Sequence, residues 1–221
     1  HFCPKFKSCS FRPGVVIGIV GVIFMDRNLE FSRAVFAERA LENAVMLGAE
    51  QYVIFRPHTN RFAYKKPHWA ENLRVFEVDS LDRIHEKLYK LEREGIEVPE
   101  GLYYVEGDFR DKSWKDTLCS CDAYRSDGET VVNLYEITQC VGRPVFESLL
   151  RTIYEATGEG SAIIFDYIDE SMGYIGRAYS EYAIEGILSQ CGFRLYEHVN
   201  AEEMRQQYLR FYNLFSSNPP I

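Results

Sequence analysis

Two acidic side chains close a hydrophobic segment of the chain, at a spacing that suits the binding of a sugar diol. The segment Leu73–Asp79 reads LRVFEVD, and its acids, Glu77 and Asp79, follow Arg56 by about 20 residues. In open α/β sheets, an acid at this distance from the first strand-to-helix turn accepts hydrogen bonds from a ribose. Asp79 is the better placed because it ends the segment. The alternative, that Asp79 only caps the following helix, stays open.

The elements that must position these acids form an alternating pattern. Short β-branched and aromatic runs predict strands at 51–55, 73–79, 102–105, 130–135, 161–167 and 194–199. Apolar residues spaced by three and four predict helices over 33–47, 80–94, 143–157, 180–190 and 201–214. Strands that alternate with helices imply an α/β fold, with a mainly parallel sheet and helices on both faces.

The net charge and the cysteine spacing argue against nucleic acid and metal ions as ligands. The 221 residues carry a formal net charge of −8, which opposes a broad contact with a phosphate backbone, so we expect no nucleic acid partner. The six cysteines form no CxxC pair and do not stand with histidines at a zinc-like spacing, so no metal site is expected. Reduced thiols in a cytoplasmic protein are the simpler interpretation.

The longest apolar run, GVVIGIVGVIFM, covers residues 14–25. As a helix it would rise about 18 Å, short of the roughly 30 Å hydrocarbon core of a bilayer, so no membrane span is expected. We interpret residues 1–30 as an N-terminal lid or helical segment and residues 31–221 as one domain. Whether the apolar run is a lid, core or the surface of a homodimer stays open.

Several short blocks then resemble a known family when taken in order. They are FAERALENAV, AEQYVI, FAYKKPHW, LRVFEVD, VEGDF, SAIIFDY and EGILSQCGFRLYEH, and they cover about residues 31–198. The order is similar to that of the S-adenosylmethionine-dependent O-methyltransferases of the leucine carboxyl methyltransferase type. The resemblance implies a class I methyltransferase-like (Rossmann-like) fold. It also implies S-adenosylmethionine as the methyl donor, and methylation of a carboxylate or hydroxyl on a small molecule or peptide.

The resemblance also implies roles for individual residues. Asp79 would accept from the cofactor ribose, with Glu77 beside it. Asp108 would accept from the adenine amino group, and Phe109 would lie along the adenine face, since carboxylates accept from amines and aromatic rings stack on purines. The alternatives are a turn for Asp108 and a core position for Phe109. Because a carboxylate acceptor is already ionised, no catalytic dyad is required, and the sequence assigns no catalytic residue.

The loop after the first strand departs from the family pattern. Where that pattern reads G-A-G-L-D-T-F-A-Y-R, residues 56–65 read RPHTNRFAYK, which places His58 and Asn60 in the part that faces the cofactor. Glycine would allow a tight turn and close contact, whereas arginine adds bulk and proline lacks a donor. A second departure covers residues 133–140, NLYEITQC. These changes support an alternative: a noncatalytic protein of the same fold that has lost the cofactor and binds an anion or a protein. The basic residues suited to an anion are Arg56, His58, Arg61, Lys65 and Lys66.

Overall fold

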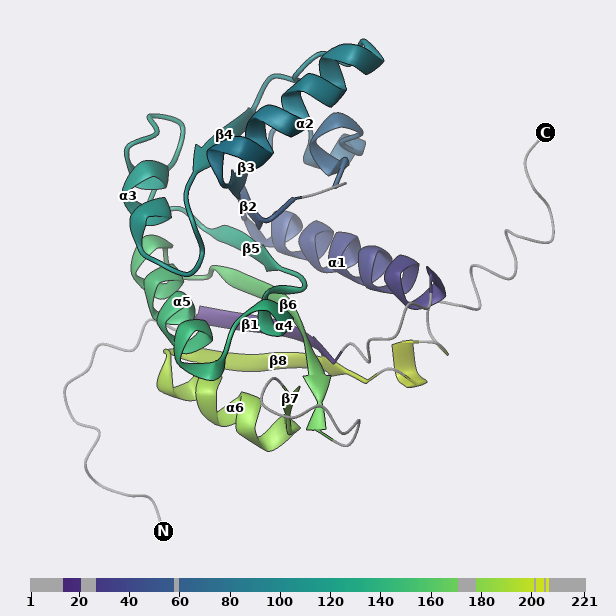
Figure 1. Cartoon of the computed structure of the whole chain (residues 1–221). Helices are drawn as coiled ribbons and strands as arrows, with labels where there is room; N and C mark the ends of the chain where they lie inside the picture. The colour runs from purple at the N-terminus through teal and green to yellow at the C-terminus, as the bar shows by residue number, and fades with distance from the viewer. Residues whose placement is uncertain are drawn as a thin grey trace.

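A computed structural model of the chain describes residues 14–20, 27–57, 60–170, 178–200, 202–204 and 206. Strands and helices alternate along it, as the sequence predicts (Figure 1). The strands are β1 (Gly14–Val20), β2 (Gln51–Phe55), β3 (Arg74–Asp79), β4 (Leu102–Glu106), β5 (Thr130–Leu134), β6 (Ala162–Asp169), β7 (Ala178–Tyr179) and β8 (Phe193–Val199). The helices are α1 (Arg27–Leu47), α2 (Leu81–Glu94), α3 (Ser113–Cys119), α4 (Ile137–Cys140), α5 (Arg143–Ala156) and α6 (Glu181–Gln190). Two short 3₁₀ helices, η1 (Phe62–Tyr64) and η2 (His68–Ala70), connect β2 to β3.

The strands form one sheet in the order β4-β3-β2-β5-β6-β1-β8, and β7 pairs with the end of β6. All of these pairings are parallel. The prediction of a mainly parallel sheet is therefore confirmed. The chain reverses its direction of progress across the sheet between β2 and β5, and ligands of such sheets bind where this reversal occurs.

Helices cover both faces of the sheet. Figure 1 shows α1 on one side of the strands and α3 and α5 on the other. On the α1 side the core contains Phe36, Leu41 and Val75; on the α5 side it contains Phe76, Trp114 and Phe165. Successive residues of a strand point to opposite faces, so Val75 and Phe76 divide the two cores between them.

The apolar segment near the start of the chain is the main departure from the sequence-based expectation. Residues 14–20 form β1 rather than a helix or a lid, and this strand pairs in parallel with both β6 and β8. An apolar run of this length has no periodicity that separates a buried strand from a buried helix. The rest of the run, 21–25, lies outside the described residues.

The sequence also predicted where α2 ends and a last helix over 201–214. Helix α2 ends at Gly95, whose φ of +66° is the left-handed conformation that glycine adopts without strain. The helix expected over 201–214 lies mostly outside the described residues, which include only 202–204 and 206. Within the described ranges, no helix combines the length and the apolar character needed to cross a bilayer.

Candidate functional site

The ends of three parallel strands form one edge of the sheet, which we call the C-terminal edge. The backbone N–H of Arg56, just after β2, donates to the carbonyl of Val78 in β3 at 2.9 Å. The N–H of Gly107, just after β4, donates to the carbonyl of Asp79 at 3.0 Å. These two bonds align the residues that follow β2, β3 and β4, so segments far apart in sequence meet at one place.

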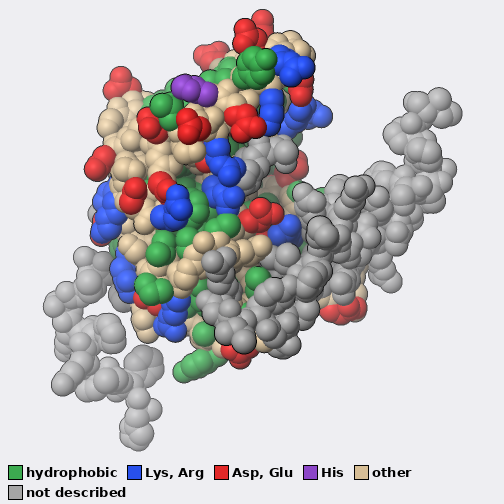
Figure 2. Space-filling model, viewed as in Figure 1, with side chains coloured by type: hydrophobic (Ala, Val, Ile, Leu, Met, Phe, Trp, Pro, Cys, Tyr) green, Lys and Arg blue, Asp and Glu red, His purple; other side chains and the backbone are tan. Residues whose placement is uncertain are grey.

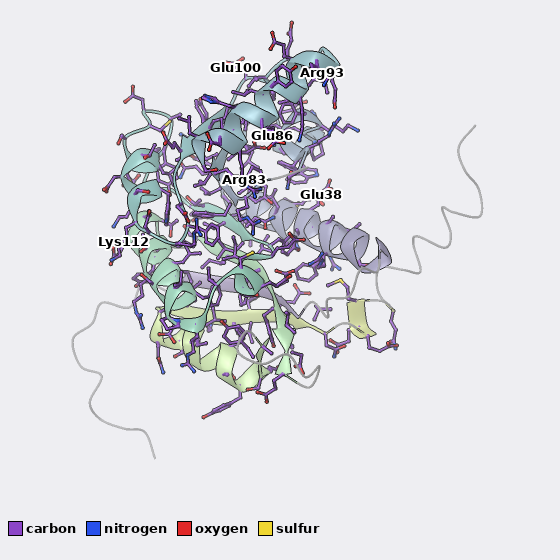
Figure 3. All side chains as sticks on the ribbon, viewed as in Figure 1. Glu38, Arg83, Glu86, Arg93, Glu100 and Lys112 are labelled. Carbon is purple, nitrogen blue, oxygen red and sulfur yellow. The ribbon has the colours of Figure 1, made fainter. Side chains whose placement is uncertain are left out.

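Asp79 ends β3 at this edge, where the sequence places a ribose acceptor. One of its carboxylate oxygens accepts the Ser80 N–H at 2.9 Å, and the Arg83 Nε lies 4.0 Å from the same oxygen. The side chain is 11% exposed, which leaves the carboxylate accessible from one direction. Figure 3 shows Arg83 toward the inner end of α2, while Arg93 lies toward the outer end. Asp79 therefore retains acceptor capacity at the strand end.

A cavity of about 300 Å³ lies beside Asp79 and extends beneath α2. Its wall includes Glu77, which is 1% exposed and accepts from Lys87 through both carboxylate oxygens at 2.8 Å. Burial raises the pKa of the Glu77 carboxyl, and the Lys87 ammonium opposes that rise. Glu77 is thus near Asp79, as predicted, but both of its oxygens are bonded to a residue of the protein.

The loop after β2 also contributes to the cavity. Asn60 lines it, and its side-chain oxygen accepts the N–H of Phe62 at 2.9 Å. Its carbonyl accepts from the Lys87 Nζ at 3.1 Å. Asn60, Glu77 and Asp79 are therefore brought together by the fold. His58 lies outside the described residues, so its predicted place in the site has no structural counterpart here.

Asp108 and Phe109 follow β4 at the same edge but do not line the cavity. The Arg110 Nε donates to both carboxylate oxygens of Asp108 at 2.9 Å. This neighbour lowers the pKa of the Asp108 carboxyl, which is therefore ionised at neutral pH. Phe109 is partly buried against the core on the α5 side. Each residue keeps a surface toward solvent, yet Asp108 already has a cationic partner.

Arg56 lies in the middle of the C-terminal edge. Its φ of +50° is the left-handed conformation, which costs a side-chain-bearing residue roughly 1–2 kcal/mol. Its guanidinium donates to the Sγ of Cys140, at the end of α4, and lies 5.9 Å from the centroid of the Phe109 ring. The side chain therefore reaches from the end of β2 to the segments that follow β4 and β5.

Gly107 determines how closely α3 approaches the segment that carries Asp108 and Phe109. A Cβ at this position would lie 2.3 Å from the Cβ of the buried Trp114, a distance that requires the backbone to move. We predict that Gly107→Ala lowers the free energy of unfolding by about 1–3 kcal/mol, as overpacking does elsewhere. Urea unfolding would measure it. The matched control is Gly186→Ala in α6, where a Cβ meets nothing within 4 Å and a slight stabilisation is expected. Equal midpoints for the two variants would contradict the prediction.

The basic cluster predicted from the sequence is divided in the structure. Arg61 pairs with Glu94 at 2.8 Å, and Lys66 donates to the Leu73 carbonyl at 2.7 Å. Burial lowers the pKa of the Lys66 ammonium. Figure 2 shows cationic and anionic side chains interspersed over the face it presents. Arg61 and Lys66 thus have separate partners, which weakens the case for a shared anion site.

A buried ion pair that the sequence analysis missed supports the neighbouring strand ends. Arg33 in α1 pairs with Asp166 in β6, and the Asp166 side chain is 0% exposed. The other oxygen of Asp166 accepts the N–H of Glu136 at 2.7 Å. Glu136 has a φ of +63° and lies two residues after the end of β5. The pair therefore ties α1 to the ends of β5 and β6.

The chain is similar to known methyltransferases in sequence and in fold. The chain is 28% identical, over 85% of its length, to YktD of Bacillus subtilis (strain 168), which is provisionally named an S-adenosyl-L-methionine-dependent methyltransferase. It spans 66% of the length of that protein. A structure from Thermobifida fusca YX, provisionally described as a methyltransferase, superposes with a TM-score of 0.50 at 13% identity. The match covers 85% of this chain and 68% of that one, and it supports the fold.

A family model describes the segment that contains most of the site. Residues 27–153, from the start of α1 to near the end of α5, match the model of the leucine carboxyl methyltransferases. The match includes the ends of β2, β3, β4 and β5, and so it includes Arg56, Asp79, Asp108 and Phe109. The chain belongs to the leucine carboxyl methyltransferase family, whose cofactor is S-adenosylmethionine.

Proposed function

We propose that the protein is an S-adenosylmethionine-dependent O-methyltransferase that acts on a carboxylate or hydroxyl of a small molecule or peptide. The observation that carries the proposal is the position of Asp79. It ends β3 at the C-terminal edge, next to the strand at which the order of the sheet reverses, and it belongs to the segment that matches the family. Its side chain is mostly buried but lines the cavity, where the carboxylate can accept from a diol.

The residues present fit the adenosine half of the cofactor. Asp79 would hold the ribose hydroxyls, Phe109 would lie along the adenine face, and Asp108 would accept from the adenine amino group. The methionine half would meet a different kind of loop, because Arg56 adds bulk and Pro57 lacks an N–H donor. When bound, S-adenosylmethionine supplies an electrophilic methyl group on a positively charged sulfur.

The titratable groups near the cavity favour a carboxylate as the acceptor. A hydroxyl acceptor needs a base, whereas a carboxylate is ionised at neutral pH and needs only orientation and exclusion of water. Burial raises the pKa of both Tyr64 and Tyr104, and the acids Glu77 and Asp108 are held by cations. Among the described residues lining this cavity, the acids other than Asp79 pair with Arg or Lys, and Asp79 is assigned to the ribose, so no acid is left to deprotonate a hydroxyl.

Arg56 supports a second candidate, a noncatalytic protein of this fold that has lost the cofactor. Its side chain occupies the space between Phe109 and Cys140, on the path from the end of β2 to the ends of β4 and β5. In this alternative Arg56 would close the crevice permanently and the surface would serve another partner. Titration with S-adenosylhomocysteine separates the two candidates, because only the enzyme binds it saturably.

The variant Asp79→Ala tests the cofactor site directly. Hydrogen bonds to a charged group contribute about 1.5–3 kcal/mol, so we expect the affinity for S-adenosylhomocysteine to fall about a hundredfold, to the edge of detection. Isothermal titration calorimetry would measure it, followed by transfer of labelled methyl groups to a panel of small carboxylic acids and peptides. Asp82→Ala, an exposed acid one turn away in α2, is the control and should bind normally. Unchanged affinity in Asp79→Ala would remove the assignment.

A further inference from the structure

A second concave surface, which we call the α2 groove, lies on the outer part of α2 and has a volume of about 690 Å³. Its wall is formed by the last turns of α2 and by residues 95–98, which follow the helix. Asp79 precedes the first turn of the same helix and does not line this groove. Figure 1 shows the end of α2 at the top of the view, at the periphery of the molecule. The α2 groove is therefore separate from the candidate cofactor site.

The floor of the α2 groove is apolar. Leu91 is buried, and Leu88 and Ile96 are half-buried. Tyr89 and Val98 also line the groove, and they are 60% and 46% exposed. A single apolar side chain on a protein surface is normal, but several that gather in a hollow mark a contact surface. The floor is thus suited to the apolar side chains of a partner.

The end of the helix holds the shape of the α2 groove. The N–H of Ile96 donates to the Leu91 carbonyl at 2.9 Å, and the N–H of Gly95 donates to the Glu92 carbonyl at 3.1 Å. These two bonds form the Schellman arrangement, in which the residue after the glycine folds back against the last turn of the helix. The groove is therefore preformed, and a ligand would lose little free energy in ordering it.

The rim of the α2 groove is acidic. Glu92 and Glu97 line it and are exposed, and no lysine or arginine is among its described lining residues. Across the ranges that the structure describes, no ion pair joins either acid to a cation. The carbonyls at the end of a helix add a partial negative charge. Arg93 lies over the Tyr89 ring, 5.8 Å from its centroid, and offsets only part of this charge.

We propose that the α2 groove binds a segment of a partner protein that carries apolar side chains flanked by lysine or arginine. The apolar side chains would cover the floor, and the cations would pair with Glu92 and Glu97. A second copy of the chain is a poor occupant, because a two-fold contact would bring these acids against their own copies. The net charge of −8 adds to that repulsion and favours a basic partner.

The test uses a fluorescein-labelled amphipathic peptide built from leucine and lysine, with binding measured by fluorescence anisotropy. Tyr89→Ser/Val98→Ser removes apolar surface, and Glu92→Gln/Glu97→Gln removes the acidic charge. All four side chains are exposed, so both variants should fold, which circular dichroism would verify. Each variant should raise the dissociation constant of the peptide about tenfold, because the peptide needs both the floor and the rim.

Matched controls make the same changes elsewhere on the surface. Tyr182→Ser removes an exposed ring from α6, and Glu159→Gln/Glu185→Gln removes two exposed acids outside the groove. Both control proteins should bind the peptide like the natural chain. In the natural chain, the peptide should also shift the methyl NMR signals of Leu88 and Ile96.

Three results would overturn the proposal. The folded natural chain does not bind the peptide; the control variants lose as much affinity as the groove variants, which indicates unspecific attraction; or the natural chain dimerises in sedimentation experiments and Tyr89→Ser/Val98→Ser abolishes the dimer. The last result would assign the groove to a second copy. None of them bears on the proposed methyltransferase activity, because titration with S-adenosylhomocysteine tests that site separately.

Discussion

Lys87→Met is expected to lower the free energy of unfolding by about 3–5 kcal/mol, because it leaves the buried Glu77 carboxylate without its partner. Lys87 donates to both oxygens of Glu77 at 2.8 Å, and the two side chains are 14% and 1% exposed. Urea unfolding monitored by circular dichroism would measure the loss. Lys90→Met, one turn along the same helix, removes an exposed pair with Glu86 and should change stability by less than about 0.5 kcal/mol.

The double variant Lys87→Met/Glu77→Met tests the cause of this loss. Replacing both partners with apolar side chains of similar size removes the uncompensated charge, so stability should recover to within about 1–2 kcal/mol of the natural chain. The pH dependence provides a second check. Burial raises the folded pKa of Glu77, so in Lys87→Met the defect should be small below about pH 4, where glutamate is protonated in both states. It should grow as the pH rises through the folded pKa. A loss independent of pH would point to packing rather than charge.

Arg33→Met is expected to cost a similar 3–5 kcal/mol, for the same physical reason at a different place. Asp166 is fully buried, and burial raises its pKa while Arg33 opposes the rise. Without Arg33 the folded state must retain an unpaired carboxylate or take up a proton. Stability should therefore decline as the pH rises above about 4, the unfolded value for aspartate. Chemical unfolding at a series of pH values would measure it.

Two further variants test whether the effect of Arg33→Met comes from the loss of its ion pair with Asp166. Asn43→Met, on an exposed position of the same helix, should lie within about 0.5 kcal/mol of the natural chain. Adding Asp166→Asn to Arg33→Met removes the charge and keeps an oxygen for the Glu136 N–H, so part of the lost stability should return. No recovery in the double variant would show that the guanidinium stabilises α1 by packing and not by pairing with Asp166.

The sequence predicted the central strands and most helices because their signals are local. Gly95 ends α2 where the periodicity of the helix ends, and the apolar run at 51–55 is short enough to be a buried strand. The segment 14–20 was misjudged because its conformation depends on strands more than a hundred residues away. An apolar run without periodicity carries no information about such distant partners.

The same distinction applies to the candidate site. Asp79 follows from its spacing and its place at the end of a strand, whereas the pairing of Asp108 with Arg110 was not predicted. The partners of the buried acids were not predicted. Lys87 meets Glu77 across the packing of a helix on a strand, and Arg33 meets Asp166 only after the sheet has formed. Such contacts depend on tertiary structure, which propensity and spacing do not encode.

The position of β1 imposes an order on biosynthesis. Its two neighbours, β6 and β8, contribute residues 162–167 and 193–199 to the pairing, so β1 is synthesised well before either of the strands with which it pairs. Long-range parallel pairing is slow to form, and unpaired strands expose surface that promotes aggregation. During that interval residues 14–20 remain an apolar segment without its strand partners.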